Sequence, residues 1–344
     1  MSVKDSILKV VEEHQIVSSK EIYEGINLKI GYATVKRAIN QLIAEGLLNA
    51  TGKGKATRYS ISESYKILFN IDADEYFAKE QDERDIIENF DLKLIPEILL
   101  KTNVFTDVEI LYLNQLHEQF KKNIAALSQS EYNKEMERLA IDLSWKSSQI
   151  EGNTYTLLET ERLLRDKETA AGKPKDDAIM LLNHKEALNF IITHPDYIVP
   201  LTIRGIEDIH SLLIKDLGVD RNIRKGRVGI SGTNYKPLDN EYQIRDSLFQ
   251  MCELINKKDN VFEKSLLAIV LLSYIQAFVD GNKRTARIVS NAILIASGYC
   301  PLSFRTVDSI DYKKAMLIFY EQNNISAFKK IFIQQYEFAI NTYF

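Results

Sequence analysis

Cysteine, proline and long hydrophobic runs are all scarce in this chain. Its 344 residues include two cysteines and six prolines, and the N-terminal stretch MSVKDSILKVVEEHQ has no apolar core of a secretion signal. A disulfide-rich secreted fold is therefore excluded, and we expect a cytoplasmic location. The most apolar run, LLAIVLLSYI at 266–275, is about half as long as a membrane helix. We expect it to form a core helix and expect no membrane partner.

An excess of positive charge is also missing. The formal net charge is −4, with 45% apolar and 27% charged residues. This composition is typical of a folded, helix-rich protein, and the length favours at least two domains. Because the chain has no overall basic field, contact with nucleic acid would need a local basic patch.

Residues 1–62 carry the signals of a compact unit of three helices and a hairpin. The first helix is predicted from Asp5 to about His14, and Ser18 with Glu21 forms a capping box that opens the second. The third helix, YATVKRAINQLIAEGLL, is followed by LLNATGKGKATRYSI, which predicts two short strands around a basic turn. The pattern resembles a winged helix-turn-helix domain.

The outer face of the predicted third helix is polar, and this unit is locally basic. Between Lys29 and Ser60 there are six cations and one acid. Such cations can neutralise phosphates while a polar helix face meets base edges in the major groove, so duplex DNA is the expected ligand. The expected contact residues are Thr34, Lys36, Arg37, Asn40, Lys53 and Lys55. The alternative is that the wing serves as a protein interface.

The composition changes after this unit. Nine acidic residues lie between Asp72 and Asp91, and we predict a solvated acidic connector at 63–95. From 96 to 344 the apolar spacing is helical almost throughout, which predicts one all-α domain. The exception is RVGISGTNYKPLDNEYQI at 227–244, where β-favouring residues, glycine and proline predict a β-hairpin laid over the helices.

A charged, glycine-containing loop separates two apolar runs. The loop IQAFVDGNKRTAR, at 275–287, overlaps the end of SLLAIVLLSYI and precedes IVSNAILIASG, and both runs are apolar enough to be central helices. Because unpaired buried charges are costly, the loop suits a helix N-terminus that binds an anion such as a polyphosphate. Asp280 could then hold the accompanying Mg²⁺. From spacing alone, the alternative is a short interhelical loop whose charges pair with one another.

Three separated motifs resemble those of the Fic (Fido) domain family. QAFVDGNKRTAR, at 276–287, resembles the family signature H-x-F-x-[DE]-G-N-[GK]-R-x-x-R. SSQIEGNT, at 147–154, resembles the [ST]-x-x-x-E-[GN] motif of the family's inhibitory helix, which we expect at about 134–152. RKGRVGISGTNYKP, at 224–237, resembles the family's hairpin flap. The motifs occur in the family's order, which implies an all-α Fic core with a small β-hairpin flap.

The resemblance implies ATP and Mg²⁺ as ligands and transfer of AMP to a Ser, Thr or Tyr hydroxyl of a protein. Asp280 would bind the metal, and the implied nucleotide-binding residues are Asp280, Gly281, Asn282, Lys283, Arg284 and Arg287. The implied inhibitory residues are Ser147, Glu151 and Gly152, with Glu151 paired to Arg287 and obstructing the γ-phosphate. The backbone of Val228, Gly229 and Ile230 would hold a target peptide by strand addition.

Two positions depart from the family pattern. Gln276 stands where the family has its histidine base, and a glutamine amide has no basic nitrogen. Lys283 stands where most AMP-transferring members have glycine, whereas lysine occurs in the Doc branch, which the resemblance associates with phosphoryl transfer. None of the five histidines lies in the loop.

Three hypotheses follow from these departures. The chain is an autoinhibited AMP transferase whose catalytic positions are Gln276 and Lys283, a Doc-like phosphotransferase, or a nucleotide-sensing DNA-binding regulator without turnover. A homodimer on a palindromic DNA site is compatible with the predicted N-terminal unit.

Overall fold

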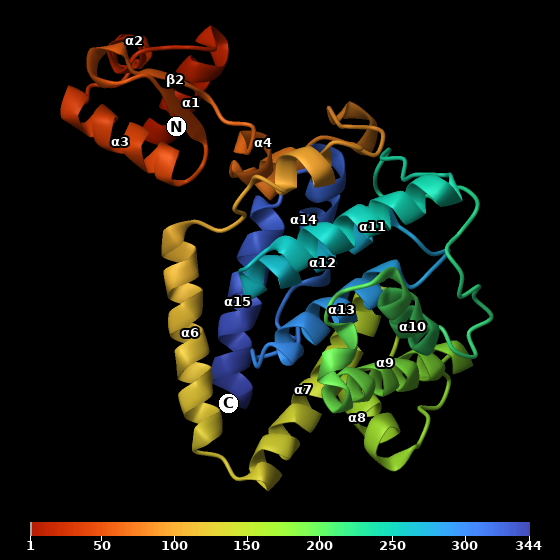
Figure 1. Ribbon diagram of the computed structural model, residues 1–344. Coiled ribbons are helices and arrows are strands. Elements are labelled where there is room, and N and C mark those ends of the chain that lie inside the picture. Colours follow the sequence, from red (N-terminus) through yellow and green to blue (C-terminus); the bar gives the residue numbers. More distant parts are fainter. Residues whose placement is uncertain (1) are drawn as a thin grey trace.

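The computed structural model describes residues 2–344, most of which lie in helices (Figure 1). The mainly α fold predicted from the sequence is confirmed, and the described residues form one two-stranded sheet. The α-helices are α1 (Val3–His14), α2 (Ser19–Gly25), α3 (Tyr32–Ala44), α4 (Tyr65–Leu68), α5 (Ala73–Tyr76), α6 (Asp107–Ala125), α7 (Gln129–Ile150), α8 (Leu157–Asp166), α9 (Lys175–Thr193), α10 (Ile203–Leu213), α11 (Glu241–Lys257), α12 (Val261–Ile275), α13 (Asn282–Ala296), α14 (Ser309–Gln322) and α15 (Ser326–Tyr343). The strands are β1 (Leu48–Thr51) and β2 (Arg58–Ile61), and the short 3₁₀ or π turns are η1 (Gly54–Ala56), η2 (Gln81–Glu83), η3 (Leu94–Leu99) and η4 (Pro195–Ile198).

Residues 2–62, here called the head, fold around their own small core at one side of the molecule (Figure 1). Capping boxes at Ser2 and Ser18 open α1 and α2. Because Ser2 is the cap, α1 begins two residues earlier than predicted. The buried side of α3 carries Val35, Ala38, Ile39 and Leu42. The order of three helices and two strands is the one predicted from the sequence, and the winged-helix assignment stays a prediction.

The hairpin of the head is antiparallel, with Leu48 opposite Ile61 and Thr51 opposite Arg58. Gly52 opens its turn at φ +83°, and a Cβ at this position would lie 2.7 Å from the carbonyl oxygen of Ala56. Only glycine therefore fits the start of the turn without moving the backbone.

The connector, residues 63–95, is not the solvated linker that its acidity predicted. Tyr65 of α4 is buried in the head, whereas Ile67 of the same short helix is buried in the larger core that follows. Ile325 N–H donates to the Ile67 carbonyl at 2.8 Å, and Asn324 Nδ2 donates to the Phe69 carbonyl at 2.7 Å. Most of the acidic side chains remain exposed, because the backbone and a few other side chains make these contacts.

Residues 96–344, here called the body, pack around α12. Apart from Lys264, every α12 residue from Phe262 to Ile275 is buried, and α11, α13, α14 and α15 lie against this helix. The core helix predicted at 266–275 is therefore confirmed. Helix α6 runs along the outside of the body beside α15 (Figure 1).

The β-hairpin predicted after residue 227 is not formed. Residues 227–236, here called the flap segment, are extended and turn at Ser231 and Gly232, but they contain no paired strands. Their partners lie in the connector instead, where Lys236 makes an isolated parallel bridge with Asn89. The β-favouring residues therefore produced an extended chain without a ladder of its own.

Within residues 2–344, no helix combines the length and the hydropathy needed to cross a membrane.

Candidate functional site

The signature loop, residues 276–287, ends α12 and begins α13. Gly281 is the N-cap of α13 with φ +81°, and a Cβ there would lie 3.2 Å from Ile214 Cγ2 and 3.3 Å from the His210 ring. The position therefore requires glycine. The first N–H groups of a helix have no partner within that helix, and with the helix dipole they attract an anion. The helix predicted to begin in this loop is present.

Asn282 and Gln276 hold the loop with their side-chain amides. Asn282 Oδ1 accepts a hydrogen bond from the Phe278 N–H at 2.8 Å, and its Nδ2 donates to Gln276 Oε1 at 3.1 Å. Gln276 Nε2 donates in turn to the Ser273 carbonyl at 2.6 Å. Gln276 is 8% exposed, and both ends of its amide are used. Its observed role is to shape the loop.

Two buried histidines lie near the loop. His210 Nε2 is 2.9 Å from the Asp280 carbonyl oxygen, and its ring stacks on Phe278 with centroids 3.6 Å apart. Burial lowers the pKa of His210, with partial compensation from the carbonyls it contacts. Burial, followed by the charges of Arg287 and Arg284, holds the pKa of His184 well below its ordinary value. Neither ring lines the cavity at the loop, so neither stands in for the missing base.

Arg284 and Arg287 are the charged groups buried beneath the loop, with side chains 2% and 0% exposed. Arg284 Nη2 lies 2.9 Å from Oδ2 of Asp280, whose own side chain is 60% exposed. Burial lowers the pKa of Arg284, and the neighbouring Asp280 only partly offsets this. Buried guanidinium groups beside a helix N-terminus are suited to bind phosphate oxygens.

Glu151, the residue that caps the C-terminus of α7, lies beside the buried arginines at the edge of the signature loop. Its Oε1 accepts a hydrogen bond from Arg287 Nη2 at 2.7 Å, and its Oε2 lies 3.7 Å from Lys283 Nζ. Burial alone would raise the pKa of Glu151, but the charges of Arg287 and Lys283 outweigh it and hold the pKa below its ordinary value. The ion pair between Glu151 and Arg287 that the sequence predicted is present.

Helix α7 also binds Arg287 through Ser147. Ser147 Oγ accepts from Arg287 Nε at 2.8 Å, and the Ser147 carbonyl accepts from Nη2 at 2.9 Å. The Arg287 guanidinium lies 5.3 Å from the centre of the Tyr312 ring. Burial acts to lower the pKa of Arg287, but Tyr312 and Glu151 outweigh it and raise the pKa. Nη1 of Arg287 has no hydrogen-bond partner among the described residues.

A cavity of about 180 Å³ opens between Glu151, the signature loop and the flap segment. Gly229 and Ile230 line it, whereas Val228 lies in an adjoining cavity of about 560 Å³. Sites for ligands of nucleotide size usually measure roughly 300–1,000 Å³. With Glu151 in its present position, the smaller cavity lies below that range.

Asp280 is the candidate ligand for a metal ion. Residues 2–344 contain no cluster of three or more His, Cys, Asp and Glu side chains that could hold a metal by themselves. Mg²⁺ is commonly bound by one or two carboxylates together with substrate phosphates and water. A single exposed carboxylate beside an anion site fits that mode.

The predicted DNA-contacting residues are all exposed. Thr34, Lys36, Arg37 and Asn40 lie on α3, and Lys53 and Lys55 lie in and beside the turn of the head's hairpin. Gly152, the third residue assigned to the inhibitory motif, has φ +98° just after Glu151 and ends the helix that carries it.

Sequence reasoning assigned no role in the site to His184, His210 or Tyr312. Each lies in a helical apolar pattern at a distance in sequence from the loop, and spacing alone cannot reveal which side of a buried helix faces it. Arg224, the first residue of the flap motif, donates from Nε to the Gln276 carbonyl at 2.5 Å, and the sequence assigned it no role in the site.

Known proteins resemble this chain in sequence and in fold. Residues 200–294, from just before α10 to near the end of α13, match the model of the Fic/DOC family. Over 176 residues, 49% of this chain and 40% of the relative, the chain is 30% identical to "Protein adenylyltransferase Fic" of Nematostella vectensis. Over 233 residues it is 24% identical to the protein of the same name from Drosophila erecta, covering 66% of this chain and 43% of the relative. The matches thus span about two fifths of these relatives.

Solved structures share the fold. Fic-1 (aa134–508) from C. elegans superposes with a TM-score of 0.60 at 20% sequence identity, covering 69% of this chain and 72% of that one. A Fic domain containing signaling protein from Bacteroides thetaiotaomicron superposes with a TM-score of 0.57 at 19% identity, covering 67% of this chain and 94% of that one. Residues 200–294 thus match the Fic/DOC family model, and the greater part of the chain shares the fold of these solved structures.

Proposed function

We propose that the signature loop binds ATP with Mg²⁺ and that Glu151 restrains this binding. The observation that carries the proposal is the Arg287–Glu151 ion pair, in which a fully buried guanidinium is neutralised by a carboxylate at the mouth of the anion site. Phosphate oxygens are negatively charged acceptors that a guanidinium binds through paired hydrogen bonds, as it binds a carboxylate, and they can replace Glu151 at Arg287. Asn282 would hold the loop in shape while Arg284 and Arg287 bind phosphates and Asp280 holds the metal.

The reaction proposed for this site is AMP transfer to a protein hydroxyl. Support comes from the two relatives, both named protein adenylyltransferases. In such a transfer the hydroxyl oxygen bonds to the α-phosphorus, the bond from that phosphorus to the bridging oxygen breaks, and pyrophosphate leaves. Positioning and charge stabilisation supply most of the acceleration in phosphoryl chemistry. The hydroxyl proton passes to water or to a phosphate oxygen of the nucleotide, because the Gln276 amide cannot accept it.

A second candidate is a nucleotide sensor without turnover, coupled to DNA binding by the head. The observation that favours it is that the Gln276 amide is hydrogen-bonded at both ends, to Asn282 and Ser273. A residue committed to loop structure suits a binding domain. A third candidate is phosphoryl transfer as in the Doc branch, and Lys283 favours it because its ammonium lies near Glu151 in the phosphate site.

Incubation with ATP labelled at the α- or the γ-phosphate separates these candidates. The decisive protein is the variant Gln276→His with Glu151→Gly, which restores a base and removes the restraining carboxylate. General-base catalysis is worth about 10² to 10⁴ in rate, so this variant should transfer α-label far faster than wild type. Arg287→Ala in the same background is the control without the phosphate contact.

Each pattern of labelling has one meaning. Transfer of α-label supports the adenylyltransferase, and transfer of γ-label supports the phosphotransferase. If neither label is transferred although calorimetry shows ATP binding, the sensor is supported. If neither label is transferred and ATP does not bind, the proposal as a whole is contradicted.

A further inference from the structure

The flap segment is held by the connector. Lys236 N–H donates to the Glu88 carbonyl at 2.6 Å, and Lys236 Nζ lies 2.8 Å from Glu88 Oε2. Gln81 Nε2 donates to Asn234 Oδ1 at 2.7 Å. Arg84 Nη2 donates to the Gly232 carbonyl at 2.7 Å. Residues 81–88 therefore hold the flap segment through one backbone hydrogen bond and several side-chain contacts.

Arg84 is the buried member of this set. Its side chain is 6% exposed and faces the fully buried Glu321 of α14. Two of its nitrogens bind that carboxylate, Nε to Oε2 at 3.0 Å and Nη2 to Oε1 at 2.9 Å. Tyr76 OH donates to Oε2 at 2.7 Å. Paired hydrogen bonds between a guanidinium and a carboxylate fix the orientation of both groups, so the N–H that reaches Gly232 has a fixed direction.

The charged contacts between the other connector side chains and the flap segment are exposed, and the bond from Gln81 to Asn234 is only partly buried. The side chains of Lys236 and Glu88 are 66% and 58% exposed, and exposed pairs contribute little to stability. Asn234 Nδ2 donates to Asp82 Oδ1 at 2.8 Å, also at the surface. The C-terminal end of the flap segment is anchored separately by the buried Tyr235, which stacks on Tyr274 and donates to its carbonyl at 3.1 Å. Arg84 joins the turn at Gly232 to the buried Glu321. It is therefore the contact that we expect to fix the turn and the residues before it.

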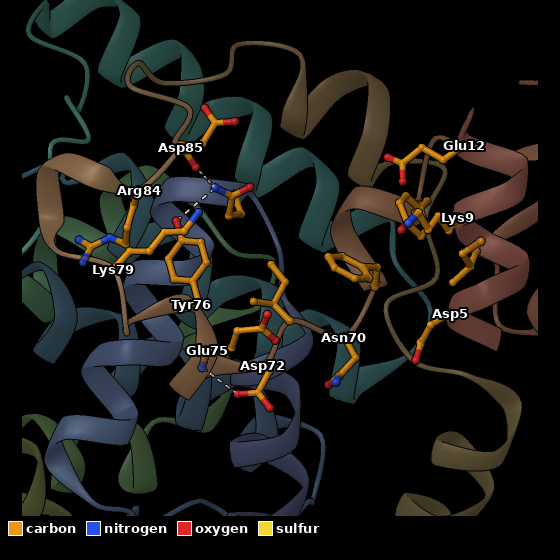
Figure 2. A pocket seen from close by; sticks show the side chains of 15 residues that line it. Asp5, Lys9, Glu12, Asn70, Asp72, Glu75, Tyr76, Lys79, Arg84 and Asp85 are labelled. Carbon is orange, nitrogen blue, oxygen red and sulfur yellow. Dashed lines mark hydrogen bonds between the residues drawn. The ribbon is translucent and has the colours of Figure 1, made fainter. Parts of the chain in front are cut away.

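Arg84 and Tyr76 also form part of one wall of a cleft between the head and the body. Figure 2 shows Tyr76, Lys79, Arg84 and Asp85 on one side of the cleft, and Asp5, Lys9 and Glu12 of α1 on the other. The cleft measures about 640 Å³. Apart from Arg84, its charged groups are exposed and of both signs, so they define no ligand. The wall matters here because the connector joins the head at one end and holds the flap segment at the other.

We propose that Arg84 is a positioning residue for the flap segment and thereby sets the place of Gly229 and Ile230 at the mouth of the nucleotide cavity. A target segment that pairs with the backbone of the flap segment would then bind to a backbone whose position the connector fixes. The consequence for target binding rests on the proposed function. The positioning itself does not, because it concerns contacts present in the protein alone.

Limited digestion with trypsin, mapped by mass spectrometry, tests the positioning in the full chain without nucleotide. Lys225 and Arg227 beside and within the flap segment have side chains 82% and 89% exposed, so cleavage after them reports how often this segment leaves its place. Arg84→Ala should raise the cleavage rate at these two sites at least about tenfold. Cleavage after Lys53 and Lys55 in the head is the internal reference.

Two further variants separate positioning from general stability. Arg84→Lys keeps a cation for Glu321 but cannot reach the Gly232 carbonyl in the same geometry, so it should recover thermal stability while flap cleavage stays fast. Arg305→Ala removes another arginine paired with a buried carboxylate, Asp142, at 3.1 Å. It should lower the melting temperature without raising cleavage after Lys225 and Arg227.

The proposal is overturned if trypsin cleaves the flap segment of Arg84→Lys at the wild-type rate. It is also overturned if Arg305→Ala accelerates this cleavage as much as Arg84→Ala does. If Arg84→Ala does not fold, Arg84→Lys alone decides. Failure of ATP to bind would leave the cleavage result unaffected, so the two proposals fail separately.

Discussion

Glu151 Oε1 lies 2.7 Å from Nη2 of Arg287, and this contact joins the end of α7 to the first turns of α13 across 136 residues of sequence. The arginine is fully buried, and the glutamate side chain is 21% exposed. A carboxylate so near the anion site prevents a second anion from using the same N–H groups. In the proposed function, the restraint is a competition between Glu151 and a phosphate for this one guanidinium.

The first prediction concerns the stability that this pair gives the free protein. Glu151→Ala leaves a buried arginine with one charged partner fewer, and we expect the free energy of unfolding to fall by about 3 kcal/mol. Glu168→Ala, which breaks the exposed pair with Arg162, should change it by less than about 1 kcal/mol. Urea unfolding at neutral pH measures both. Equal losses in the two variants would contradict the buried role of Glu151.

The second prediction concerns pH. His184 is fully buried, and neither ring nitrogen has a partner among the described residues. Burial and the charges of Arg287 and Arg284 hold the pKa of His184 well below the ordinary 6.5. As the pH falls below 6.5, His184 therefore binds a proton in the unfolded chain while it stays neutral in the folded chain. The stability due to the neutral ring is therefore present above pH 6.5 and is lost as pH falls, by up to about 1.4 kcal/mol per pH unit.

His184→Leu removes this group, so its stability should fall less than that of wild type between about pH 7.5 and 5.5. Loss of two unpartnered nitrogens also predicts little or no loss of stability at about pH 7.5. His194→Leu, at the exposed end of the same helix, is the control and should follow wild type. Parallel curves for wild type and His184→Leu would refute the assignment.

The third prediction concerns the head. If α3 and the turn of the hairpin contact duplex DNA, the full chain binds it with an affinity that falls steeply with salt. Arg37→Ala and Lys53→Ala should each weaken binding and reduce the salt slope by about one. The control Lys167→Ala removes an exposed cation of the body and should leave both the affinity and the salt slope unchanged. Binding that does not change with salt would indicate a protein interface instead.

Much of this arrangement could be predicted from local sequence. The buried helix at 266–275 follows from its composition, and the start of α13 follows from Gly281 with its cluster of cations. The pair of Glu151 and Arg287 could be predicted only through the family motif, because no local pattern links positions so far apart in sequence.

The parts that were predicted wrongly depend on long-range contacts. The flap segment has β-favouring residues, but its backbone partners lie at 81–89, in a segment whose acidity suggested exposure to solvent. The burial of Arg84 with Glu321 is equally invisible in sequence, because each looks like an ordinary surface charge. Charge counts predict the average exposure of a segment and not the exposure of a particular side chain.

The most direct test of the account is a calorimetric titration of three proteins with Mg·ATP: wild type, Glu151→Gly, and Glu151→Gly with Arg287→Ala. If Glu151 and the phosphates compete for Arg287, the Glu151→Gly variant binds at least about tenfold more tightly than wild type, and the added Arg287→Ala removes most of that gain. The melting temperature should rise with ATP in the same order. Equal affinity of wild type and Glu151→Gly, or no binding by either at millimolar Mg·ATP, would contradict the claim that Glu151 restrains a nucleotide site.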